Sequence, residues 1–133
     1  MEKREAVLSA LKLEQIVFDK IEFKRLGFSS EKELELGIQS KIMQKEDEDV
    51  YRVTLELTGN KPEEYVFEIS LTGFFMIESE NGLTEEMKNM LITKNSISIL
   101  MPYLRSEVSL LTAQPGVECV VLPAFNISKM LET

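Results

Sequence analysis

The apolar residues of this 133-residue chain change their spacing once, near residue 82, and this change constrains the fold more than any other feature. Before it, apolar and polar residues alternate, which is the period of a strand. After it, apolar residues recur at spacings of three and four, which is the period of a helix. Strands followed by helices are typical of an α+β fold. We therefore predict one domain over 1–133, with a four-stranded antiparallel sheet and helices packed on one face of it.

Four alternating runs predict the four strands. In the first, which begins at Leu11 and continues through 21–23, the alternation changes phase, and this predicts a β-bulge or a bend. The second covers 33–44. The third, 50–58, and the fourth, 65–77, are separated by Gly59-Asn60-Lys61-Pro62, which predicts a turn and an antiparallel hairpin.

Helical spacing begins at Thr84, which can cap a first helix because Glu85 and Glu86 then fall in its first turn. A second helix is predicted over 97–111, and its caps would be Asn95, Ser96 or Ser98. Pro102 is awkward inside that helix and predicts a kink or a helix start close by. An apolar extended run over 117–122 and a last short helix over 127–132 complete the prediction.

The residues that are missing limit the chemistry. The chain has no histidine and one cysteine, Cys119, so a histidine base, a Ser-His-Asp site, a zinc knuckle and a disulfide within the chain are excluded. Cys119 stands in an apolar run, which favours a buried packing residue over a nucleophile. We therefore predict a binding module rather than an enzyme, with no catalytic residue and no metal site.

The formal net charge of −8 argues against nucleic acid as a partner, because phosphate contacts need basic clusters. No apolar run approaches the roughly 20 residues of a membrane-spanning helix, so we predict no membrane insertion. The charged N-terminus is not followed by an apolar signal core, and we expect a cytoplasmic protein.

Several segments together resemble the SecB-type protein-export chaperones. The most specific is 95–108, because Leu100-Met101-Pro102-Tyr103-Leu104-Arg105 is similar to the family's "LFPYARE" helix start. The segment 122–127 resembles "LAPVNF", 49–53 resembles "DVYEV", and Gly73-Phe74-Phe75 resembles "GGIF". Ile16 to Phe23 is similar to the family's first strand, and the resemblance covers about 11–131.

The resemblance implies a homotetramer built as a dimer of dimers, with neither enzymatic activity nor a cofactor. Members of the family hold unfolded client polypeptides in apolar grooves. Many deliver clients to the translocase motor ATPase for protein export, and some relatives protect antitoxins in toxin–antitoxin operons. By the resemblance, we expect this chain to be such a chaperone.

Matching positions place a client-binding groove between the second strand and the last helix. Its predicted residues are Leu34, Leu36 and Ile38 on the strand and Ile127, Met130 and Leu131 on the helix. The family's longer C-terminal helix and acidic tail have no counterpart in this sequence, which predicts a shorter or more open groove. Motor contacts made through that tail are not expected here.

A partner-docking face is expected on Lys20, Lys24 and Glu68. The family presents acidic residues to the motor on its first strand, whereas this chain has Lys20 and Lys24 there. Glu68 keeps an acid that the family uses for docking. Like charges across an interface weaken binding, so we predict a weakened motor contact and a narrower client set, for example an antitoxin.

The stripe on the predicted helix over 97–111 is interpreted as an interface within the chain or between chains, and it is assigned as the oligomer interface. The residues assigned to it are Ile97, Leu100, Met101, Leu104 and Val108. Two alternative functions stay open on the residues alone. One is a structural oligomeric adaptor, whose apolar surface only builds its own assembly, and the other is a small-ligand or lipid-binding domain.

Overall fold

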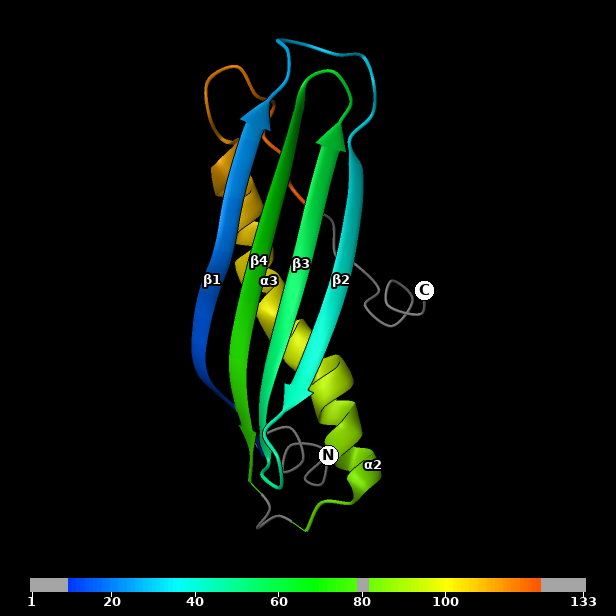
Figure 1. Cartoon of the computed structure of the whole chain (residues 1–133), viewed down its shortest axis with the longest axis vertical. Helices are drawn as coiled ribbons and strands as arrows, with labels where there is room; N and C mark the ends of the chain where they lie inside the picture. The colour runs from blue at the N-terminus through cyan, green and yellow to red at the C-terminus, as the bar shows by residue number, and fades with distance from the viewer. Residues whose placement is uncertain (1–9, 79–81, 123–133) are drawn as a thin grey trace.

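Four antiparallel strands form one sheet in the spatial order β1-β4-β3-β2 (Figure 1). They are β1 (Leu11–Arg25), β2 (Glu35–Gln44), β3 (Val50–Lys61) and β4 (Tyr65–Ile77). The computed structural model describes residues 10–78 and 82–122 of the chain. Strands β4 and β3 are central, and β1 and β2 are the two edges of the sheet, as the four-stranded α+β prediction requires.

Among the described residues, one run of helix crosses one face of this sheet, here called the inner face. It consists of α2 (Glu85–Met90), the π-helical turn η2 (Leu91–Asn95) and α3 (Ser96–Thr112). Figure 1 shows the run passing diagonally behind the sheet, from beside the end of β2 to the far end of β1. The α+β prediction, with helix on one face of an antiparallel sheet, is confirmed.

The predicted break between two helices is wrong. Thr84 does cap α2, because its hydroxyl accepts a hydrogen bond from the backbone N–H of Met87 at 3.1 Å. At the predicted second start, however, Asn95 has helical backbone angles and its side chain makes no capping hydrogen bond. The Ser96 hydroxyl donates to the carbonyl of Ile92 within the helix. The Ser96 hydroxyl is thus satisfied inside a continuous helix, and Pro102 lies within α3.

The inner face of α3 packs on the two central strands. Leu100 approaches Gly73 so closely that a Cβ on that glycine would lie 2.7 Å from Leu100 Cδ2. The five residues assigned to an oligomer interface are all buried in the chain's own core, against the sheet. They are therefore not available to a second subunit, which corrects the assignment of these side chains. They are Ile97, Leu100, Met101, Leu104 and Val108.

Strand β1 carries the irregularity that its change of phase predicted. Its pairing with β4 shifts between Leu13 and Gln15 and again between Phe18 and Lys20. At the second shift the Asp19 carboxylate accepts a hydrogen bond from the Thr72 hydroxyl at 2.5 Å. The bulge prediction is confirmed, and the extra residue is tied to the sheet by its side chain.

The turn of the β3–β4 hairpin lies later than predicted. Gly59 and Asn60 are part of β3, and the turn follows at 62–64, where Glu63 has a φ of 73°. Glu64 is 4% exposed and holds the loop before β2, because its carbonyl accepts from Leu26 N–H at 2.7 Å and its carboxylate accepts from Ser30 N–H at 2.9 Å. The hairpin turn thus fixes where β2 begins.

The segment 117–122 is irregular and lies along α3. Arg105 Nε donates to the carbonyl of Leu122 at 3.2 Å, and the Thr112 hydroxyl accepts from Val120 N–H at 2.8 Å. Cys119 is exposed, so the prediction of a buried packing residue is wrong. Hydrogen bonds hold the segment 117–122 against α3, and the side of the segment that faces away from α3 is open. The helix predicted over 127–132 lies outside the described residues.

Candidate functional site

The inner face of the sheet consists of rows of residues that face one another across the strands. Antiparallel pairing places Leu36 opposite Gly59, which is opposite Phe67, and places Ile38 opposite Leu57, which is opposite Ile69. Further along, Ile42 lies opposite Val53. Residues directly opposite each other point to the same face of a sheet. The apolar residues of β2 therefore extend the rows that form the core, as the alternation in 33–44 predicted.

Exposure rises along these rows toward β2. Val53 is 0% exposed and Leu57 is 1% exposed, whereas Ile42 and Leu36 on β2 are 38% and 39% exposed. The cause is the diagonal path of the helix, which packs on β4 and β3 and passes β2 only at its end (Figure 1). The inner face of β2 is an apolar strip with no helix over most of its length, within the part of the chain that the structure describes.

An aromatic floor adjoins this strip. A Cβ on Gly59 would lie 2.2 Å from the Phe67 ring, so the ring occupies the space above the glycine. Phe67 stacks with Tyr65, with ring centroids 6.2 Å apart, and Tyr65 stacks with Phe23 at 5.1 Å. Because Gly59 has no side chain, no other side chain stands between Leu36 and Phe67 in this row. We name the surface formed by Leu36, Ile38 and Ile42 with this floor the β2 groove.

The far end of the β2 groove meets α2 in a cavity of about 380 Å³ whose lining includes Ile42, Tyr51 and Ile92. Lys88 closes it with an ion pair to Asp49, 3.2 Å from Nζ to Oδ2. The hydrogen bond to Asp49 raises the pKa of Lys88, and burial raises the pKa of the Tyr51 hydroxyl. The lining of this cavity is mixed, with apolar side chains from β2 and η2 and polar side chains that include Gln44, Lys88 and Asn89.

The structure tests the positions of half of the predicted groove residues. Leu36 and Ile38 lie together on β2, and Leu34, just before the strand, packs partly buried against the core. Ile127, Met130 and Leu131 lie outside the described residues. Ile42 and Phe67 were not assigned to the groove from the sequence. The alternation of 33–44 already placed Ile42 on this face, but no sequence signal shows that the Phe67 ring lies over Gly59.

The predicted partner-docking residues lie on the other, outer face of the sheet. Lys20 Nζ is 2.7 Å from Glu68 Oε2 and 3.5 Å from Glu22 Oε2, and the hydrogen bond to Glu68 raises the pKa of Lys20. Lys24 and Glu68 both line a shallow depression of about 710 Å³. Lys20 and Glu68 thus neutralise each other, which could not be predicted because the bulge at Asp19 sets their register.

A second apolar surface lies on the outward side of α3. Ile99, Tyr103 and Leu110 are 36%, 46% and 70% exposed, and their spacing of four and seven places them on one stripe. This stripe was not predicted, because the stronger stripe of buried residues dominates the same helix. The spacing of these three residues was nevertheless visible in the sequence.

Sites of other kinds do not appear in the described part. Across 10–78 and 82–122, no cluster of three or more acidic or cysteine side chains is arranged to hold a metal ion. No helix there is both long and apolar enough to span a membrane. The candidate site in the described residues is the β2 groove, an apolar surface at one edge of the sheet.

Comparisons with known proteins identify the family of the chain. The family model described as the preprotein translocase subunit SecB matches residues 23–133. A curated relative, the protein-export protein SecB of Anaplasma phagocytophilum, is 27% identical over 81 residues, which are 61% of this chain. The match spans about half, 51%, of that relative's length.

A solved structure has the same fold. The SecB-like chaperone Rv1957 of Mycobacterium tuberculosis, solved in complex with a peptide from the antitoxin HigA1, superposes with a TM-score of 0.72. The superposition covers 94% of this chain and 96% of the chaperone, at 12% sequence identity. At this identity the likeness shows the fold.

Proposed function

The chain belongs to the SecB family of preprotein translocase subunits, and from this premise we propose that it is a molecular chaperone that holds non-native polypeptides in the β2 groove. The observation that carries the proposal is the apolar strip of Leu36, Ile38 and Ile42, which continues the core rows but stays partly exposed. Contiguous exposed apolar surface marks binding sites. A chaperone that only holds its clients needs no catalytic group, in keeping with the chemistry that the composition excludes.

The strength of such a groove follows from its size. Fully burying one leucine or isoleucine side chain contributes about 1.5–3 kcal/mol, and these side chains are already half-buried. One groove therefore contributes only a few kcal/mol of binding. Several grooves in one assembly would engage a long unfolded client together, which increases the apparent affinity without new contacts. A weak groove repeated in an oligomer suits a chaperone that must also release its client.

We propose the homotetramer on this basis, built as a dimer of dimers. The stripe of Ile99, Tyr103 and Leu110 supports an interface on the outward side of α3, because apolar stripes on helices are usually covered. This replaces the buried set of α3 residues as the candidate contact with other subunits.

Two roles are compatible with a chaperone of this family, protein export and protection of an antitoxin. The curated relative is named as a protein-export protein, whereas the solved chaperone was captured with an antitoxin peptide. The pairing of Lys20 with Glu68 supports a weakened contact with the translocase motor ATPase, because the acid expected for docking already lies beside a lysine. We propose a SecB-like chaperone whose clients, for example an antitoxin, do not depend on that motor.

The direct test is suppression of aggregation of an unfolded protein, such as α-lactalbumin whose disulfides have been reduced. Leu36→Asp places a charge in the β2 groove and should abolish suppression. Gln39→Asp on the exposed outer side of the same strand is the matched control and should leave it intact. Equal suppression by both variants would show that the client does not bind in the β2 groove. Intact oligomers without suppression in the unmodified protein would favour the structural adaptor instead.

Met130→Asp extends the same assay to the helix predicted over 127–132. If that helix forms the second wall of the groove, the variant should lose suppression as Leu36→Asp does. Full suppression by Met130→Asp together with loss in Leu36→Asp would limit the groove to the sheet.

A further inference from the structure

The backbone edge of β2 is open within the described part of the chain. β2 is the last strand in the order β1-β4-β3-β2, and the backbone hydrogen bonds that the structure gives its residues go to β3. The polar groups on its other side point away from the sheet. An edge of this kind is a template on which another extended chain can pair.

The register identifies which residues present these free groups. Lys45 N–H donates to the carbonyl of Val50 at 2.9 Å, and these two residues continue the β2–β3 register. They therefore form a hydrogen-bonded pair, and such pairs alternate with non-hydrogen-bonded ones in an antiparallel ladder. The residues in the non-hydrogen-bonded pairs direct their N–H and C=O away from β3; they are Leu36, Ile38, Ser40, Ile42 and Gln44.

The residues with free backbone groups are also the residues whose side chains form the β2 groove. Leu36, Ile38 and Ile42 each present an apolar side chain to the inner face and an N–H and C=O to the edge. A chain that pairs with this edge would place every second side chain on the same inner face. The edge and the groove are thus two parts of one surface.

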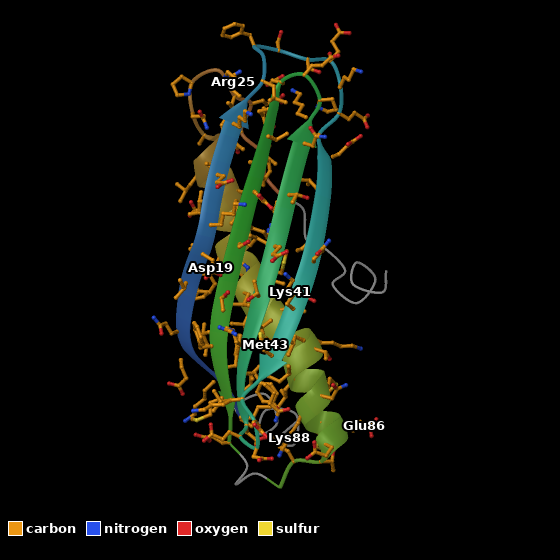
Figure 2. The ribbon with its side chains drawn as sticks, viewed as in Figure 1. Asp19, Arg25, Lys41, Met43, Glu86 and Lys88 are labelled. Atoms are coloured by element: carbon orange, nitrogen blue, oxygen red, sulfur yellow. The ribbon has the colours of Figure 1, made fainter. Side chains whose placement is uncertain are left out.

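Within Glu35–Gln44, a β-bulge and a proline, two of the devices that usually prevent pairing, are absent. Its ladder with β3 is unbroken over Glu35–Gln44, whereas β1 at the opposite edge has two register shifts. β2 contains no proline, and the charge of Lys41 is held on the outer face by Glu56, 3.1 Å from Nζ to Oε1. Figure 2 labels Lys41 and Met43 on this strand. Bulges, prolines and free inward charges are the common protections of an edge.

We propose that the client binds as a fifth strand of the sheet, antiparallel to β2, as an extended segment with apolar side chains at alternate positions. This inference rests on the proposed function. The free groups of Leu36 to Ile42 span roughly 20 Å, so a segment of about seven residues is required. Backbone pairing is independent of side-chain identity, and alternate apolar positions supply the selectivity. A proline-containing segment would be rejected because proline cannot donate to the ladder.

The test uses a labelled peptide in which valine alternates with threonine over seven residues, with a lysine at each end. In an antiparallel addition, valines on the groove side lie in hydrogen-bonded pairs with β2 and direct their N–H groups to it. N-methylation of the valines should weaken binding at least about tenfold, because several hydrogen bonds are lost. N-methylation of the threonines should leave the affinity within about twofold, because their N–H groups point to solvent.

Hydrogen exchange of the full-length protein supplies the second arm. Binding of the unmethylated peptide should slow exchange at the amides of Ile38, Ser40 and Ile42 and leave those of Gln39 and Lys41 unchanged, since the latter already bond to β3. Ser40→Pro removes one free N–H and should weaken peptide binding, while Ser40→Ala should not. The peptide and exchange arms do not depend on whether Ser40→Pro folds.

Several outcomes would overturn the fifth strand. In the peptide arm they are equal affinities of the two methylated peptides, a stronger loss of affinity from threonine methylation, and no binding of the unmethylated peptide. In the exchange arm the contradicting result is that the amides of Ile38 and Ser40 are already protected without peptide, because another part of the chain or a second copy covers the edge. If the protein still suppresses aggregation, the proposed chaperone function survives and only the binding mode fails. If suppression is also absent, the proposed function fails as well.

Discussion

The two leucines Leu57 on β3 and Leu36 on β2 lie on the same face of one sheet, yet one is 1% and the other 39% exposed. Both strands have the same alternation of apolar and polar residues. The difference arises from the helix run, which packs on β4 and β3 and leaves most of β2 uncovered. Alternation therefore specifies a face of the sheet. The path of a helix distant in sequence then decides that the part of this face on β3 is core and the part on β2 is left as a surface for binding.

The largest effect is expected in the covered half. Leu57→Ala removes a fully buried side chain and should lower the free energy of unfolding by about 2–5 kcal/mol. Urea denaturation followed by circular dichroism measures this directly. A loss below about 1 kcal/mol would mean that the row containing Leu57 is not part of the core.

The same substitution in the open half should act on binding instead. Leu36→Ala removes a side chain that is 39% exposed, so we expect a much smaller loss of stability than for Leu57→Ala and a clear loss of affinity for an unfolded client. Fluorescence anisotropy of a labelled, reduced client measures the affinity. Similar stability losses for the two leucines would remove the distinction between core and groove.

A smaller effect is expected at alkaline pH in the aromatic floor between the two halves. Burial raises the pKa of Tyr65 above its ordinary value of 10.0. The folded protein therefore favours the neutral phenol, and stability is present below pH 10 and decreases as the pH rises above it. Tyr65→Phe should show a weaker decrease in urea midpoint between pH 9 and pH 11, roughly the range of phenol titration. An identical decrease in both proteins would show that ionisation of Tyr65 does not contribute to the loss of stability at alkaline pH.

The smallest effect on the fold is expected on the outer face. Lys20→Glu combined with Lys24→Glu removes the pair with Glu68 but leaves the core untouched, so the melting temperature should change little. The unmodified protein should not bind the translocase motor ATPase at ordinary salt, and the double variant should gain binding. Co-purification with the motor that is lost in the double variant would reverse this interpretation.

The sequence was sufficient for the sheet, for its α+β class and for the face of β2 that carries Leu36, because these follow from local periodicity. It was not sufficient where distant segments meet. The pairing of Lys20 with Glu68 depends on a bulge whose position no local pattern fixes. The continuous helix through Ser96 depends on a hydrogen bond within the helix, where a serine could equally serve as a cap.

The buried stripe of α3 is a second case in which a local pattern does not show which surfaces meet. Helical spacing predicted that Leu100 and Leu104 lie on one face, but spacing cannot say whether the covering surface is the chain's own sheet or another subunit. The close approach of Leu100 to Gly73 decides for the sheet. Cys119 was misplaced for a related reason, since an apolar run predicts burial only if both of its sides are covered.

The central claim is that unfolded clients contact the inner side of β2, and site-specific photo-crosslinking tests it most directly. A photoreactive side chain at Leu36 and another at Gln39 sample the two sides of the same strand. The account predicts an adduct with a reduced, unfolded client from position 36, little from position 39, and none from either position with the native client. Equal adducts from both positions, or none from position 36, would contradict it.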